Sequence, residues 1–171
     1  MPQQTINYLH PIGFEGQVYT ENTRAIRGAL QELFNGDPVN YLPFGRVVVP
    51  GTNPRQAVLP TASAQTPLGV TIQVFMYGYR ESEYATGAVL GYPPLKHVNI
   101  ITMGDVLVYC GNAVNPGDPV YYNYQAFTAP YDQLGRFTNA PATGFAQYPN
   151  AKFLKGLSSG GGLVPIGVFG Y

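Results

Sequence analysis

From residue 41 onward the chain consists of short apolar runs separated by glycine and proline. Runs such as GRVVVP, KHVNIITM and DVLVYC are rich in β-branched residues and are bounded by Gly or Pro. Short runs of this composition, with turn residues between them, are typical of strands in all-β domains. We therefore expect a mainly β domain over residues 41–171, either an antiparallel β-sandwich of the jelly-roll kind or a barrel.

One stretch has helical spacing instead. In TENTRAIRGALQELF (residues 20–34) the apolar side chains fall at i, i+4, i+7 and i+8, which are Ile26, Leu30, Leu33 and Phe34. That spacing places them on one face of a helix, and Asn35-Gly36 would end it. The pattern predicts one short N-terminal helix, which we assign with the preceding residues to an N-terminal arm over residues 1–40.

The first fifteen residues have apolar side chains without a sustained period, interrupted by Pro2, Pro11 and Gly13. Two interpretations stand side by side. The segment is either an extended arm that docks on a partner or a strand and loop of its own domain. In the first interpretation its apolar residues are contact candidates, above all Tyr8, Leu9 and Phe14.

Composition favours a protein that assembles. Charged residues make up 11% of the chain, against about 25% in an average soluble domain, and formal net charge is zero. No run of Lys or Arg is present, which argues against a nucleic-acid partner. The 14 Tyr residues suit packing, because tyrosine offers a large apolar ring with a polar tip. No apolar run has the length of a membrane span and the N-terminus lacks an export signal, so we expect no membrane partner and synthesis in a cytoplasm without export.

The residues of common active sites are scarce. Two histidines, His10 and His97, and the single Cys110 lie far apart in sequence and do not form a metal motif. Ser158, His97 and Asp105 could form a Ser-His-Asp set, but the sequence around the serine lacks the spacing of a nucleophile elbow. Glu81 and Glu83 would lie on one face of an extended chain, as a catalytic carboxylate pair requires, but they fall in a segment expected to be an exposed loop. We therefore expect no enzyme, no metal and no cofactor.

The stretch VNPGDPVYY (residues 114–122) has a lone acid beside a Pro-Gly pair. In Asn115-Pro116-Gly117-Asp118, proline presets φ at the second position of a type II turn and glycine supplies the positive φ of the third. Asp118 is then placed to accept hydrogen bonds from nearby backbone N–H groups. We interpret Pro116, Gly117 and Asp118 as a structural turn and not as a chemical site.

Two tyrosine clusters are further candidates for contact with a partner or for self-association. They are Tyr77 with Tyr79, and Tyr121 with Tyr122 and Tyr124. Rigid aromatic side chains are common anchors of interfaces. The alternative is that they occupy successive strand positions, half in the core and half in solvent.

The order of these segments resembles the structural cement, or decoration, proteins of tailed-bacteriophage capsids. The resemblance runs over residues 41–171 and is carried by a succession of stretches: LPFGRVVVPGT, PLGV, KHVNIITMGDVLVYC, VNPGDPVYYN, GRFTN, NAKFLKG and SSGGGLVPI. Each stretch alone is weak, and their order and spacing together are more specific. The first forty residues do not match strongly.

The resemblance implies a β-rich protein that binds the outer surface of the virion capsid. There it would stabilise contacts between subunits of the major capsid protein, as a homo-oligomer, with a trimer favoured and a dimer as the alternative. The family offers no catalytic residues to carry over. A receptor- or glycan-binding β module of a phage particle is the second functional interpretation, since tyrosine rings also stack on sugars.

Overall fold

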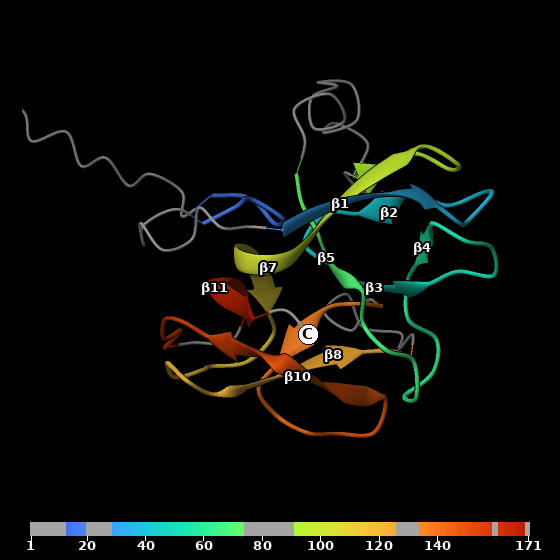
Figure 1. The fold of residues 1–171 in the computed structure, drawn as a ribbon. Coiled ribbons are helices and arrows are strands. Elements are labelled where there is room, and N and C mark those ends of the chain that lie inside the picture. The colour runs from blue at the N-terminus through green and yellow to red at the C-terminus, as the bar shows by residue number, and fades with distance from the viewer. Residues whose placement is uncertain (1–12, 20–28, 74–90, 126–133, 159–160, 170–171) are drawn as a thin grey trace, which may run out of the picture.

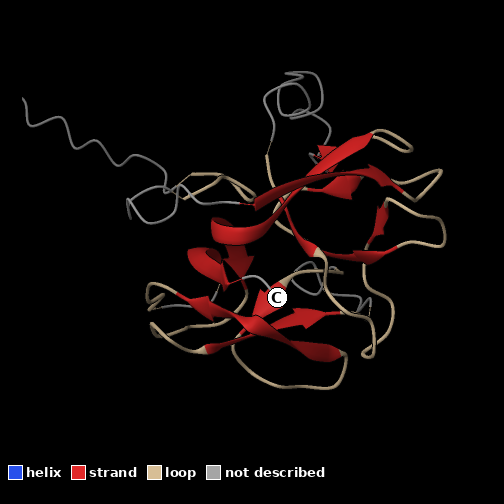
Figure 2. Ribbon diagram, in the orientation of Figure 1, coloured by secondary structure: helices blue, strands red, loops and turns tan. Residues whose placement is uncertain are grey.

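The structure is a computed structural model that describes residues 13–19, 29–73, 91–125, 134–158 and 161–169. Every regular element within these ranges is a β-strand (Figure 2). The expectation of a mainly β fold is therefore confirmed, and of the architectures considered the barrel is present. No helix long and apolar enough to cross a bilayer occurs in this part of the chain.

Nine of the strands form one continuous sheet, in the order β1-β4-β3-β5-β7-β11-β10-β8-β9, and two more form a small separate pair, β2-β6. Their bounds are β1 Ala29–Asn35, β2 Leu42–Pro43, β3 Val47–Pro50, β4 Gln56–Val58, β5 Gly69–Thr71, β6 Gly91–Tyr92, β7 His97–Cys110, β8 Pro119–Asn123, β9 Phe137–Thr138, β10 Phe145–Phe153 and β11 Gly162–Phe169.

The first half of β7 closes a barrel, which lies in the upper half of Figure 1. It pairs with β5 on one edge and with β1 on the other, and β1 returns through β4 and β3 to β5. These five strands therefore leave no open edge between them. The sequence led us to expect antiparallel strands, but the β1–β4 pairing is parallel.

The second half of β7 belongs to what we call the lower sheet, formed with β11, β10, β8 and β9 (Figure 1). Its antiparallel pairing with β11 runs from Met103–Phe169 to Cys110–Gly162. A single parallel pairing of Cys110 with Phe137 in β9 brings this group back to β7. One strand of 14 residues is thus shared by both halves of the molecule.

Alternation along the strands separates two hydrophobic cores. Val48 and Ile100 point into the barrel core, where they meet Leu33, Phe44 and Tyr92. Their chain neighbours Val47 and Ile101 point the other way, into a larger core against the lower sheet. Successive residues of a strand face opposite sides, so both faces of these strands are buried. This accounts for runs such as VVV that lack an apolar–polar alternation.

The prediction of an N-terminal helix is wrong for the part of its range that the structure describes. Residues 29–34 lie in β1, and residues 20–28 lie outside the described residues. In β1 the side chain of Leu33 is buried in the barrel core, while Glu32 is exposed. The antiparallel register with β7 extends from Ala29–Met103 to Phe34–His97. Non-local pairing and burial override a local helical pattern, because helix propensity is a weak preference.

The segment before β1 is also fastened to β7. Leu107 of β7 donates its N–H to Gln17 O (2.8 Å) and its carbonyl accepts from Gly16 N (2.8 Å). Beside this contact, Arg46 forms an ion pair with Glu15, and the Arg46 side chain is only 2% exposed. Burial lowers the pKa of Arg46, and the negative charge of Glu15 opposes that shift. Residues 13–19 therefore belong to the folded body.

Candidate interaction surfaces

The Pro-Gly stretch forms a turn between Val114 and β8. Asp118 N donates to Asn115 O (3.2 Å), and Gly117 has a φ of 86°. The third residue of a type II turn has a φ near +80°, which glycine adopts without strain. Gly117 N also donates to Phe153 O (2.7 Å), which ties the turn to the end of β10.

The Asp118 carboxylate is used within this turn. Its Oδ2 accepts hydrogen bonds from Asn115 N (2.9 Å) and from Asn139 Nδ2 (2.9 Å). The Asn115 N–H, followed by the Asn139 amide, holds the pKa of Asp118 below its ordinary value, and the charge of Lys152 acts in the same direction. Hydrogen bonds to the charged form favour ionisation. The group is therefore an ionised turn cap, unlike a general acid, whose pKa is raised.

The tyrosines of β8 lie on different sides of the strand. Tyr122 is 1% exposed, belongs to the larger core, and donates its hydroxyl to Gln65 O (2.9 Å). Tyr121 is half-buried at the next position, and Tyr124 packs partly buried against the same core. The ring of Tyr122 therefore lies in the core, whereas Tyr121 and Tyr124 remain partly exposed.

Of the other aromatic and apolar candidates, only Phe14 lies within the described residues. It is 43% exposed at the start of the segment that docks on β7. Tyr8, Leu9, Tyr77 and Tyr79 lie outside the described residues.

A different surface is formed where β1 ends. Three loops meet there: residues 36–41, 51–55 and 93–96, which we call the loop end. They lie side by side at the right of the barrel in Figure 1. Phe34 N donates to Arg55 O (2.8 Å) and Asn35 N donates to Lys96 O (2.9 Å), so the last residues of β1 hold two of the loops.

The side chain of Asn35 joins these loops further. It is fully buried, and its Nδ2 lies 3.0 Å from Asn40 O and 3.2 Å from both Tyr92 O and Pro93 O. Its Oδ1 accepts from Asp37 N (3.0 Å). An asparagine amide has two N–H donors and a carbonyl acceptor, and all are engaged here. One buried side chain thus fixes two loops to the barrel.

Two turns of the loop end have strained backbones. Arg55 (φ 63°) and Leu95 (φ 58°) are the non-glycine residues with positive φ in the described part of the chain. Each is the third residue of a turn, closed by Gln56 N to Asn53 O (3.3 Å) and by Lys96 N to Pro93 O (3.3 Å). A side chain in this conformation costs roughly 1–2 kcal/mol.

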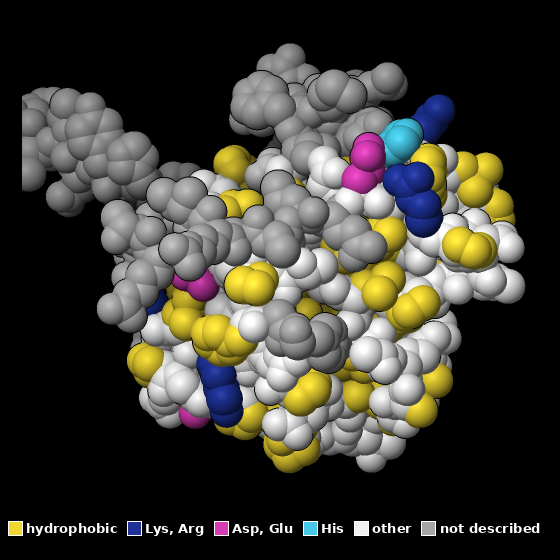
Figure 3. Space-filling view, in the orientation of Figure 1, with side chains coloured by type: hydrophobic (Ala, Val, Ile, Leu, Met, Phe, Trp, Pro, Cys, Tyr) yellow, Lys and Arg dark blue, Asp and Glu magenta, His cyan; other side chains and the backbone are white. Residues whose placement is uncertain are grey.

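The loop end exposes large apolar side chains. Val39 is 75% exposed, Leu95 59% and Tyr41 45%, three of the six exposed large hydrophobic residues among those described. Figure 3 shows hydrophobic, charged and histidine side chains gathered at this corner of the molecule. This surface is not apparent from the sequence, because its residues are contributed by three separate loops.

The charges of the loop end and of the adjoining ends of β1 and β7 are unequally paired. Glu32 Oε1 lies 2.8 Å from His97 Nδ1, and the Asp37 carboxylate accepts from Val39 N (2.8 Å) and from Asn40 N (2.9 Å). The hydrogen bonds from Asn40, joined by that from Val39, lower the pKa of Asp37. Both carboxylates are therefore engaged within the surface.

The two cations of the loop end have no carboxylate partner among the described residues. Arg55 stacks over the Phe34 ring, with 5.5 Å between its Cζ and the ring centroid. The Lys96 side chain is exposed. The formal charges of these two carboxylates and two cations sum to zero, but only the cations have side chains without an ion-paired or hydrogen-bonded partner in the described structure.

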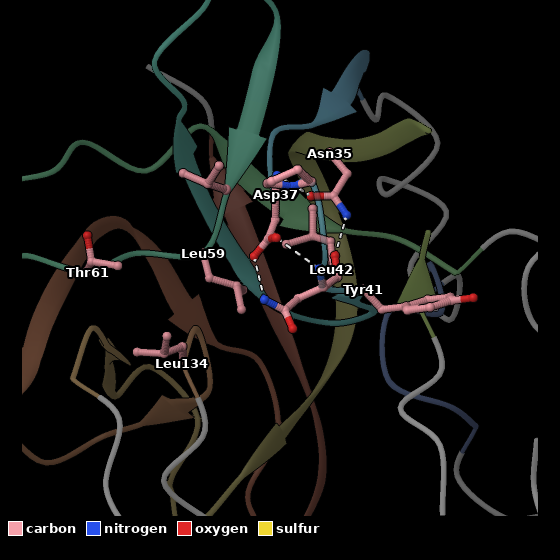
Figure 4. A pocket seen from close by; sticks show the side chains of 10 residues that line it. Asn35, Asp37, Tyr41, Leu42, Leu59, Thr61 and Leu134 are labelled. Atoms are coloured by element: carbon pink, nitrogen blue, oxygen red, sulfur yellow. Dashed lines mark hydrogen bonds between the residues drawn. The ribbon is translucent and has the colours of Figure 1, made fainter. Parts of the chain in front are cut away.

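A hollow of about 490 Å³ lies beside the loop end (Figure 4). Two of its polar side chains, Asn35 and Asp37, are already hydrogen-bonded within the neighbouring loops. No reactive side chain is added by the rest of its lining, which consists of Pro38, Asn40, Tyr41, Leu42, Val58, Leu59, Thr61 and Leu134.

The described residues assemble no catalytic set. His97 and Asp105 lie eight residues apart in β7, roughly 26 Å along the strand, and Ser158 follows β10. Burial raises the pKa of the Cys110 thiol, which keeps it protonated and unreactive. No group of three or more His, Cys, Asp and Glu in this part of the chain could hold a metal ion. Glu81 and Glu83 lie outside it.

Comparison with solved structures supports the fold. A chain of the capsid of Myoviridae phage XM1 aligns with a TM-score of 0.64 at 16% identity, over 92% of this chain and 90% of that one. At this identity the likeness concerns the fold. No curated protein matches the sequence.

A family model matches residues 2–168, so the match extends over the N-terminal segment in which the sequence resemblance was not strong. The model describes the structural cement proteins represented by E217 gp24 and Pam3 gp6. Because the match spans nearly all of the 171 residues, the chain belongs to the family of phage structural cement proteins.

Proposed function

We propose that this protein binds the outer surface of a phage capsid and stabilises contacts between neighbouring subunits of the major capsid protein. The observation that carries the proposal is the family match over residues 2–168. The protein acts as a homo-oligomer, with a trimer favoured, and becomes part of the virion without performing a reaction.

Physical features of the chain are consistent with such a role. The barrel has paired strand edges, and the described residues offer exposed apolar groups in place of a catalytic set. A capsid repeats the same site many times, and an oligomer that engages several copies binds more tightly than one subunit does. Modest individual contacts are then sufficient to hold a shell together.

The test uses capsid shells of the phage that encodes the chain, prepared without this protein. Purified protein is added, and binding is measured by co-sedimentation and shell opening by heating. We expect saturable binding and a higher opening temperature. Light scattering gives the oligomeric state, and reconstruction of the particles gives the surface occupied. A monomer that does not sediment with shells contradicts the proposal.

A further inference from the structure

Leucine is unfavourable at position 95 both for its backbone conformation and for its exposure to solvent. Its backbone φ of 58° suits glycine or asparagine, and its side chain is 59% exposed although it is apolar. Strained residues that persist are held by their surroundings, and they are concentrated at functional sites. The fold would be served better by glycine, so the leucine side chain itself requires an explanation.

The surroundings of Leu95 are rigid. Asn35 bonds to Asn40 O and Pro93 O through one nitrogen atom, which places the loop of Val39 beside the loop of Leu95. A loop whose backbone is already held loses little backbone conformational entropy when its side chains bind a partner. Val39 and Leu95 thus have the properties of preorganised anchors.

The pairing of charges indicates the chemistry of the partner. The carboxylates of Glu32 and Asp37 are engaged, whereas Arg55 and Lys96 have no carboxylate partner in the described structure. A partner surface with carboxylates around an apolar recess would complement both features. A nucleic acid is a poorer match, since two cations are few and the anchors are aliphatic.

We propose that the loop end is the surface through which this protein contacts a capsid shell subunit. Leu95 and Val39 enter an apolar recess, and Arg55 and Lys96 meet carboxylates at its rim. The inference rests on the proposed function and adds to it the location and chemistry of the contact.

The decisive variant is Leu95→Gly, because glycine relieves the strained backbone while it removes the anchor. Phe169→Ser is the matched control, since Phe169 is 60% exposed on β11, away from the loop end. Lys96→Glu tests the rim, with Lys155→Glu as its control. Each variant is titrated onto shells that lack the protein, and melting temperature and oligomeric state are recorded in parallel.

We expect Leu95→Gly to melt no lower than wild type and to bind shells at least about tenfold more weakly, while Phe169→Ser binds as wild type. Lys96→Glu should weaken binding more than Lys155→Glu does. Wild-type-like binding by Leu95→Gly overturns the assignment of the loop end, although the proposed function stands. A change of oligomeric state in Leu95→Gly also overturns it, because the surface would then join copies of this chain. If the wild-type protein does not bind shells, both the proposed function and the assignment of the loop end are wrong.

Discussion

The turns Asn115–Asp118 and Pro93–Lys96 have similar backbones and different residues at the same position. Each is closed by a hydrogen bond from the fourth N–H to the first carbonyl, at 3.2 Å and 3.3 Å. In each the third residue has a positive φ, 86° at Gly117 and 58° at Leu95. Glycine adopts that conformation freely, whereas leucine adopts it at a cost.

Gly117 suits the backbone conformation of its turn, whereas Leu95 adopts the same kind of conformation although it is unfavourable for leucine. A Cβ at Gly117 would have open space around it, so the glycine is explained by its backbone alone. Leu95 is explained by neither its backbone nor its burial. The first turn serves to connect strands, and the second presents a side chain.

The largest expected effect comes from releasing the loops that hold the Leu95 turn. Asn35→Ala removes the amide that bonds Asn40 O, Tyr92 O and Pro93 O, and leaves buried polar groups unpaired. We expect the free energy of unfolding to fall by about 3 kcal/mol, since each unpaired buried group costs roughly 1–3 kcal/mol. Urea denaturation measures it. Asn40→Ala, which retains the Asn40 carbonyl, is the control, and an equal loss there would contradict the central role of Asn35.

Gly117→Val should lower the free energy of unfolding by about 2 kcal/mol, because a β-branched residue is strained at positive φ. Gly111→Val is a closely matched control. Its Cβ also meets nothing within 4 Å, but Gly111 is not among the glycines with positive φ. The control should change stability by less than about 0.5 kcal/mol. Equal effects in urea denaturation would mean that the backbone conformation does not explain Gly117.

Leu95→Gly should act in the opposite direction and raise the free energy of unfolding by about 0.5 kcal/mol. Relief of the positive φ outweighs the greater freedom of glycine in the unfolded chain. Val39→Gly, at an exposed loop position without positive φ, should instead destabilise slightly. If Leu95→Gly destabilises as much as Val39→Gly, the contrast between the two turns does not hold.

Asp118→Asn should have the smallest effect. The folded pKa of Asp118 is lowered, so its ionisation stabilises the fold above the unfolded pKa of about 3.9, and this contribution is lost as pH falls through the folded value. The asparagine oxygen can still accept from Asn115 N and Asn139 Nδ2. We expect a slightly lower melting temperature than wild type at pH 7, a difference that disappears as pH falls through the folded pKa of Asp118, and unchanged shell binding. A difference that grows in acid would contradict this assignment.

Local chemistry made the strands and the Pro-Gly turn predictable, because β-branched runs and a Pro-Gly pair act over a few residues. Residues 29–34 have a helical spacing, but pairing with β7, more than sixty residues away, makes them a strand. The loop end could not be predicted for a similar reason. Its three loops come together through buried bonds of Asn35, and nothing in the sequence YPPLKH indicates a positive φ at Leu95.

The continuity of β7 has a mechanical consequence. Its first residues adjoin the loop end and its last residues pair with the lower sheet, so a pull on the loop end travels along one covalent backbone. If a shell is bound at the loop end, a pull on that contact is passed along β7 to the strands of both halves of the molecule.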